Sequence, residues 1–156
     1  MDDVQSLRRI LKAYKTVAMV GLSNNWYRPS YFAAKYLQKQ GYKVIPVNPA
    51  YTEVLDEKCY PDLASIPEPI DIVDCFRKVE EIPALTEQAI AINAKVLWMQ
   101  LGIVDEVSAK KAEVAGLEVV MNRCMKIEYA RLFGGLNFIG VNTKVISSKR
   151  PLWLPY

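Results

Sequence analysis

Short apolar runs alternate with stretches of helical periodicity along most of this chain, and no other feature of the sequence limits the fold as much. The runs that fit β-strands are 16–21, 43–47, 70–76, 95–99 and 117–121. A continuous apolar run is typical of a strand covered on both faces, and intervening helices make the crossovers that parallel strands need. The pattern predicts an α/β fold, a doubly wound Rossmann-like parallel sheet of about five strands with helices on both faces.

Helices are expected at 4–14, 31–40, 79–92 and 106–115. Ser30 is the expected N-cap of the second of these helices. If the expected strands are numbered along the chain, right-handed crossovers lead to the strand order 3-2-1-4-5. Pro46 lies in the second strand, where it removes a backbone donor, so we expect a bulge or an unpaired register there.

A chain of 156 residues is long enough for one domain with its own core, which we place at residues 1–132. Residues 133–156 show no clear period and are expected to form an extended arm. Its apolar residues favour docking on a neighbour, in a homo-oligomer or on another protein, and a wrap over its own domain is the alternative. Up to Glu128 there are 16 basic and 17 acidic residues, and four basic residues follow. This nearly neutral body predicts that nucleic acid is not a partner.

The chain contains no histidine, which excludes Ser-His-Asp and Cys-His catalysis and every histidine-containing zinc site. Cys59, Cys75 and Cys124 show no C-x-x-C spacing, so neither a metal site nor a disulfide framework is predicted. Reduced thiols indicate a cytoplasmic protein. The amino terminus is acidic, and no run approaches the roughly 20 apolar residues of a membrane span, so neither secretion nor a membrane is expected.

The loop after the first expected strand carries groups that suit an anion. Gly21 allows close backbone approach, Ser23 and Ser30 add hydroxyl groups, and Arg28 adds a guanidinium. Helix N-termini at the carboxyl edge of a parallel sheet direct N–H groups toward a ligand, so the loop predicts a site for a diphosphate. An ordinary turn with a surface arginine is the alternative.

Two other phosphate sites lack their motifs. The loop has one glycine where a nicotinamide dinucleotide site has G-x-G-x-x-G. The second strand ends in Asn48 and Pro49, where that site has an acidic residue for the ribose. No G-x-x-x-x-G-K-[ST] sequence is present either, so hydride and phosphoryl transfer are not favoured.

Several strand-end segments together resemble the CoA-binding domain proteins, small Rossmann-like proteins similar to the amino-terminal domain of the succinyl-CoA synthetase α-subunit. The resemblance covers about residues 15–132. The segments are Val20-Gly21-Leu22-Ser23 with Arg28-Pro29-Ser30, 41–49, Ile70-Asp71-Ile72-Val73-Asp74, Trp98-Met99-Gln100-Leu101-Gly102 and Asn122-Arg123-Cys124.

The resemblance implies that coenzyme A or an acyl-CoA is the ligand. It places residues of three regions at the site: near the diphosphate, beside the nucleotide half, and along the adenine or pantetheine. Near the diphosphate it places Gly21, Leu22, Ser23, Arg28 and Ser30, and beside the nucleotide half it places Asn48 and Pro49. Along the adenine or pantetheine it places Phe76, Arg77, Gln100 and Gly102. Asn122, Arg123 and Cys124 close the far side. The alternatives are that Phe76 finishes a core strand and that the arginines are solvated.

Cys124 is the most tempting catalytic candidate, because the neighbouring cations Arg123 and Lys126 would lower the pKa of its thiol. No histidine is present to act as its base, and a small buried residue that leaves room for a ligand explains it equally well. Asp71 and Asp74 could form a carboxylate pair, but Asp74 is expected to bond a neighbouring loop. No catalytic residue and no metal ligand is therefore predicted.

The sequence favours a stand-alone CoA or acyl-CoA binding protein that is non-catalytic or regulatory. The synthetase that it resembles passes phosphate through a histidine on a second domain, so this chain is not expected to be a complete synthetase. One alternative is an acyl-CoA-dependent transferase or thioesterase-like enzyme that uses Cys124. The others are a nicotinamide dinucleotide-binding protein and a subunit-interaction protein.

Overall fold

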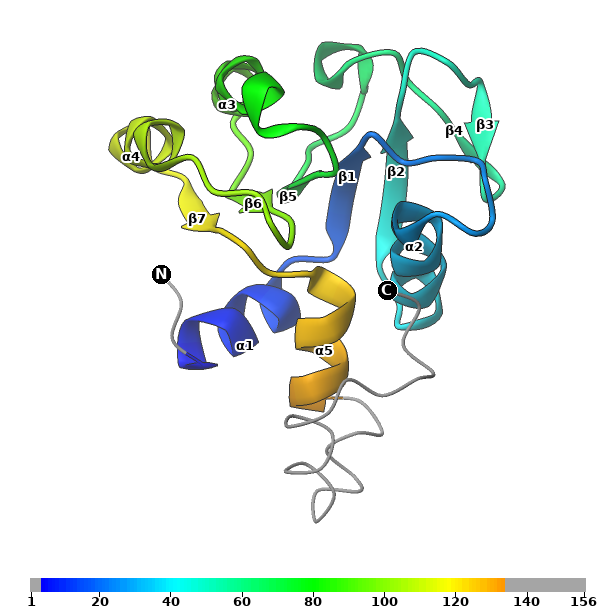
Figure 1. Cartoon of the computed structure of the whole chain (residues 1–156), viewed down its shortest axis with the longest axis horizontal. Helices are drawn as coiled ribbons and strands as arrows, with labels where there is room; N and C mark the ends of the chain where they lie inside the picture. The colour runs from blue at the N-terminus through cyan, green and yellow to red at the C-terminus, as the bar shows by residue number, and fades with distance from the viewer. Residues whose placement is uncertain (1–3, 134–156) are drawn as a thin grey trace.

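The structure is a computed structural model, and it describes residues 4–133 (Figure 1). A parallel sheet of five strands forms its centre, and helices cover both faces, so the predicted Rossmann-like α/β class is confirmed. Phe133, expected to begin the arm, instead ends the last helix. The rest of the expected arm lies outside the described residues. No helix in the described range is long and apolar enough to cross a membrane.

All five expected strands are present, one with the expected bounds and four slightly shorter. They are β1 (Thr16–Val20), β2 (Lys43–Val47), β5 (Ile72–Cys75), β6 (Val96–Met99) and β7 (Glu118–Val120). The helices are α1 (Val4–Ala13), α2 (Pro29–Lys39), α3 (Ile82–Ala91), α4 (Glu106–Val114) and α5 (Met125–Phe133). A small hairpin, β3 (Glu53–Val54) with β4 (Glu57–Lys58), and 3-10 turns at Leu63–Ser65 and Val79–Glu81 complete the described chain. The hairpin and α5 were not predicted.

The predicted strand order 3-2-1-4-5 is wrong. The order is β2-β1-β5-β6-β7, so the third expected strand pairs with β1 and not with β2. Pro46 gives the physical reason. Its carbonyl accepts a hydrogen bond from the Tyr60 N–H, 3.0 Å away, on the side of β2 that faces away from β1. An edge strand tolerates a residue without an N–H on that side, whereas a central strand loses a ladder bond there.

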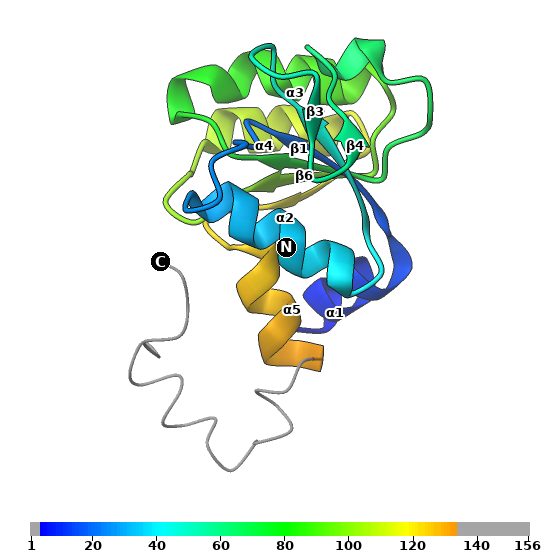
Figure 2. The ribbon, with the colours of Figure 1, turned by 90° about the vertical axis from the view of Figure 1, so that its right-hand side faces the viewer.

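Two hydrophobic layers cover the sheet. Figure 2 shows helices α1, α2 and α5 on one face of the sheet and α3 and α4 on the other. The side chains of each group of helices fill the layer on their own face. The four residues of β5 and of β6 are all buried, which explains the unbroken apolar run of β6 and leaves Asp74 as a buried polar residue in β5. Trp98 of β6 is fully buried and donates its indole N–H to the Arg123 carbonyl at 2.6 Å. This hydrogen bond joins β6 to the turn after β7.

Candidate functional site

The strand order places the reversal of the sheet between β1 and β5, because β2 follows on one side of that pair and β6 and β7 follow on the other. A doubly wound sheet binds its ligand outside the carboxyl ends of the strands at such a point. Two cavities of about 320 Å³ and about 750 Å³ open there. They share Arg28, Pro29 and Phe76 as lining residues. The two cavities therefore form one cleft with two compartments.

Hydroxyl groups line the smaller cavity and also organise the loop around it. Ser30 Oγ accepts a hydrogen bond from the Ser23 N–H at 3.0 Å, and Ser23 Oγ accepts one from the Asn25 N–H at 3.0 Å. Each hydroxyl keeps its own proton for a ligand. The backbone N–H groups of Ser23 and Asn25 are already bonded, so these two amides are not offered to an anion, whereas the two hydroxyls and the Arg28 guanidinium are.

The start of α2 differs from the prediction. The helix begins at Pro29, so Arg28 occupies the N-cap position, and the side chain of Arg28 makes no capping bond. Ser30, expected as the N-cap, lies in the first turn and is buried. Proline suits the first helical position because the N–H it lacks would have no partner there. This start leaves the Arg28 side chain on the wall shared by the two cavities.

Gly21 lines the smaller cavity, but its neighbours show a second reason for a glycine. Its φ is +91°, and a Cβ at this position would overlap the carbonyl oxygen of Phe76. The loop after β1 therefore packs directly on the loop after β5, and only glycine fits between them. Phe76 is half-buried against the core and also borders both cavities. Phe76 therefore packs against the core and also borders the candidate site.

Asn48 ties the turn after β2 to the loop after β1. Its Nδ2 donates to the Leu22 carbonyl at 3.2 Å, and its Oδ1 accepts from the Ala50 N–H at 2.9 Å. Asn48 lines the smaller cavity together with Tyr51, whereas Pro49 is not among the residues lining either cavity. Leu22 is buried in the core, so its side chain has a packing role.

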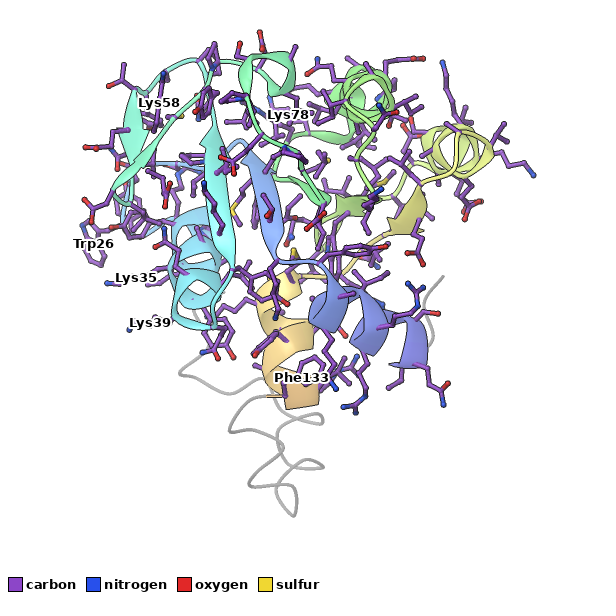
Figure 3. All side chains as sticks on the ribbon, turned by 180° about the vertical axis from the view of Figure 1, so that it is seen from behind. Trp26, Lys35, Lys39, Lys58, Lys78 and Phe133 are labelled. Atoms are coloured by element: carbon purple, nitrogen blue, oxygen red, sulfur yellow. The ribbon has the colours of Figure 1, made fainter. Side chains whose placement is uncertain are left out.

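The larger cavity has apolar walls and a charged mouth. Phe76, Leu101, Ile103 and Ile127 supply the apolar surface, and the charged residues are Arg28, Arg77, Lys78 and Glu81. The Arg77 Nε lies 3.9 Å from Glu81 Oε1, and an exposed pair at this distance holds neither side chain firmly. In Figure 3 the Lys78 label marks the loop between β5 and α3. The basic groups suit an anionic ligand that enters an otherwise apolar cavity.

Gln100 and Cys124 also line the larger cavity, and behind Gln100 lies the buried Asp74 of β5. Gln100 Nε2 donates to Asp74 Oδ1, while no hydrogen bond to Asp74 Oδ2 is present in the described part of the structure. Burial raises the pKa of Asp74 to about 7, and the Gln100 bond opposes this only in part. Asp74 therefore bonds the residue that follows β6, as the sequence predicts. Asp71 instead accepts the backbone N–H groups of Lys15 and Thr16, each at 3.3 Å.

The Cys124 thiol is not activated. The residue precedes α5, and its sulfur accepts backbone N–H bonds from Lys126 and Ile127, which lower its pKa. Burial outweighs them and raises the pKa of Cys124 to about 11. Lys126 also lowers the pKa of Cys124, but the expected net lowering is wrong, because the residue is only 7% exposed and burial dominates. At neutral pH the group is a thiol, and it offers little as a nucleophile.

Gly102, Asn122 and Arg123 are not brought into the cavity walls. Asn122 has a φ of +60° and accepts the Gly102 N–H at 2.7 Å, which joins the turns after β6 and β7. Arg123 forms an ion pair with the buried Glu128 at 3.5 Å. These predicted site residues therefore shape the loops behind the larger cavity.

Sequence reasoning missed several residues that line the cavities, among them Tyr51, Lys78, Glu81 and Ile127. Lys78 and Glu81 follow the strand that ends at Cys75, so a signal for them was present in their distance from a strand end. Ile127 belongs to α5, a helix that the sequence analysis did not expect. Among the described residues no group of three or more cysteine, aspartate or glutamate side chains is placed to hold a metal ion.

The strand order and the cleft at its reversal define a Rossmann-like α/β domain with a strand-end ligand site. A family model described as a CoA binding domain matches residues 15–130. This chain belongs to that family, and the resemblance found in the sequence is confirmed.

Three relatives illustrate the likeness. The "Uncharacterized protein YneT" of Bacillus subtilis is 38% identical over 124 residues, which cover 80% of this chain and 92% of that protein. A solved structure described as a hypothetical protein from Pyrococcus horikoshii is 44% identical, covers 85% of this chain and 94% of its own, and superposes with a TM-score of 0.83. A 60-residue stretch is 35% identical to the ADP-forming acetate–CoA ligase II of Archaeoglobus fulgidus, covering 37% of this chain and 9% of that enzyme.

Proposed function

We propose that this protein binds coenzyme A or an acyl-CoA in the cleft at the carboxyl ends of β1 and β5, and that it acts as a binding protein rather than as an enzyme. The observation that carries the proposal is the division of the cleft. A small compartment with hydroxyl groups meets a larger compartment with apolar walls, and Arg28 lies on the wall between them. Coenzyme A has the same division, because an anionic nucleotide is joined through a diphosphate to a long uncharged arm.

The charges support this orientation of the ligand. Ser23, Ser30 and Arg28 would hold the diphosphate with hydroxyl and guanidinium donors, and Asn48 would lie beside the nucleotide. The arm would run past Phe76 into the larger cavity, between the apolar side chains after β6 and those of α5. Family membership and the stretch shared with an acetate–CoA ligase support the same ligand class.

A binding role is supported by the groups that the cleft lacks. The chain has no histidine, and the one thiol on the cleft wall has a raised pKa. Asp74 is wholly buried behind Gln100 rather than on the cavity surface. General acid–base catalysis needs a group that is within hydrogen-bond reach of the substrate and can exchange its proton. The Asp74 carboxyl lies behind Gln100, and the Cys124 thiol, which lines the larger cavity, keeps its proton at neutral pH.

Calorimetric titration of the purified chain with CoA, acetyl-CoA, ADP and NAD tests the proposal. We expect CoA and acetyl-CoA to bind more tightly than ADP, because ADP leaves the larger cavity empty, and we expect no saturable binding of NAD. Absence of measurable CoA binding at millimolar ligand would overturn the proposal. A hydrolysis assay with acetyl-CoA in the same samples is expected to show no turnover above the buffer rate.

A further inference from the structure

A carboxyl group in the middle of an apolar layer calls for an explanation. Asp74 belongs to β5, pairs in register with Met19 of β1 and Trp98 of β6, and has no exposed surface. Burial of a carboxyl group is unfavourable unless hydrogen bonds and charge compensate, and a well-packed apolar residue is often as stable or more so. A stabilising role in the core therefore does not account for Asp74.

The one side chain that bonds Asp74 in the described structure also reaches the cleft. Gln100 directly follows β6, donates its Nε2 to Asp74 Oδ1, and lines the larger cavity although only 4% of it is exposed. The NH₂ group of Gln100 is therefore the end of the carboxamide that faces Asp74, where the carboxyl oxygen Oδ1 accepts its hydrogen bond. The carboxamide is planar, so the bond turns its oxygen, Oε1, away from Asp74. The bond thus decides which end of the carboxamide is left for the cavity.

We infer that Asp74 is a positioning residue, which holds the Gln100 carboxamide so that Oε1 is the acceptor for an amide N–H of the pantetheine arm. The inference rests on the proposed function and names the part of the ligand that is recognised. The arm carries two amide N–H groups, which are stronger donors than its thiol. The other walls are largely apolar, so a fixed acceptor gives this compartment its hydrogen-bonding specificity.

Three variants separate a positioning role from a structural one. Asp74→Leu removes the acceptor, and the Gln100 carboxamide is then free to rotate. Asp74→Asn keeps an oxygen that can accept from Gln100 Nε2, so it is the conservative variant. Gln100→Leu removes the proposed contact itself. Thr86→Val is the matched control, because Thr86 is also a buried polar residue, bonds the Ile82 carbonyl within α3 at 2.8 Å, and lines neither cavity.

Affinities for CoA, acetyl-CoA and ADP are measured by calorimetry for each variant. We expect Asp74→Leu and Gln100→Leu to weaken CoA and acetyl-CoA alike by about tenfold, the equivalent of one hydrogen bond. ADP affinity is expected to stay within twofold, which also verifies that each variant is folded. Asp74→Asn and Thr86→Val are expected to bind all three ligands as the wild type does. If Asp74→Leu fails to fold, Gln100→Leu carries the test.

Several results would overturn the inference while leaving the proposed function in place. Unchanged CoA affinity in Gln100→Leu would show that Gln100 makes no contact with the ligand that contributes to binding. A loss in Asp74→Asn as large as that in Asp74→Leu would assign the effect to the charge instead of the acceptor. A loss confined to CoA, with acetyl-CoA unaffected, would assign the donor to the thiol. If the wild type itself binds no CoA, the proposed function fails first.

Discussion

Replacing Asp74 by asparagine should change how the stability of this protein depends on pH. Burial raises the pKa of Asp74 from the usual 3.8 to about 7 in the folded protein. Between these values the folded protein keeps a proton that the unfolded chain releases, so the free energy of unfolding falls as the pH rises through this window. Above pH 7 both states are ionised and the loss is complete. Asparagine does not titrate, so the variant escapes this loss.

The size of the effect follows from the shift. A difference of about three pKa units corresponds to about 4 kcal/mol at 1.36 kcal/mol for each unit. The free energy of unfolding of Asp74→Asn, minus that of the wild type, should therefore rise by up to about 4 kcal/mol between pH 4 and pH 8. Asparagine keeps the shape and the acceptor for Gln100, so packing changes contribute little to the difference.

The assay is urea unfolding of both proteins at half-unit steps from pH 4 to pH 8.5, followed by circular dichroism and by tryptophan fluorescence. Other carboxyl groups titrate equally in both proteins, so they cancel in the difference. A difference that stays constant across this range would refute the reasoning, because it would mean that Asp74 titrates alike in the folded and unfolded states. A difference that falls with pH would show that the carboxylate is stabilised in the fold.

Three further predictions concern the cleft. Gly41→Ala should lower the free energy of unfolding by about 1 kcal/mol, because Gly41 has a positive φ in open space. Gly21→Ala should lower the free energy of unfolding further, because its Cβ also meets the Phe76 carbonyl. Equal losses of the two variants in urea unfolding would contradict this contact. Arg28→Ala should weaken CoA binding in calorimetry by about 1.5–3 kcal/mol. Arg123→Ala should leave CoA affinity nearly unchanged, because the Arg123 guanidinium pairs with Glu128. A larger loss in Arg123→Ala than in Arg28→Ala would assign the ligand contact to Arg123 instead of Arg28. The pKa of Cys124 is raised to about 11, so its thiol should react with iodoacetamide at pH 8 much more slowly than a small free thiol. Peptide mass spectrometry measures the extent of labelling. Rapid labelling of Cys124 in the folded protein would contradict the argument that burial raises this pKa.

The strands could be predicted because burial on both faces requires unbroken apolar runs, as in Val96–Met99. Their order was predicted wrongly although the deciding residue was recognised. Pro46 suggested a bulge or an unpaired register, whereas it lies in unbroken register with Met19 of β1 and its carbonyl accepts a hydrogen bond from Tyr60 on the outer side. The further step, that such a residue favours an edge strand, would have excluded a central position for β2.

Other elements left weaker signals. The β3–β4 hairpin turns through Leu55 and Asp56, which both have positive φ. Leucine is rare in such a turn, so its presence did not predict one. Helix α5 has few residues and follows directly on the turn that contains Asn122. Its apolar face packs with α1 and α2 in the same layer, and that contact exists only in the folded protein.

The sequence predicted some of the residues that line the cleft, but it did not distinguish them from polar residues that bond neighbouring loops instead. Ser23, Arg28 and Phe76 line the cleft as expected. Asn122 and Arg123 also follow a strand, but their polar groups bond neighbouring loops and a buried glutamate. The distance from a strand end predicts which loop a residue occupies, but the direction of its side chain depends on partners that lie far away in the sequence.

The outer border of β2 limits how this sheet can grow. Pro46 has no N–H to offer along that border. The Tyr60 N–H already donates to the Pro46 carbonyl, and the Tyr60 carbonyl accepts a hydrogen bond from the Asn48 N–H. A strand from another polypeptide would find few vacant partners at this end of β2, so fusion of two sheets edge to edge through it is disfavoured. Self-association of the folded domain should therefore proceed through helix surfaces or the short β7 margin rather than through β2.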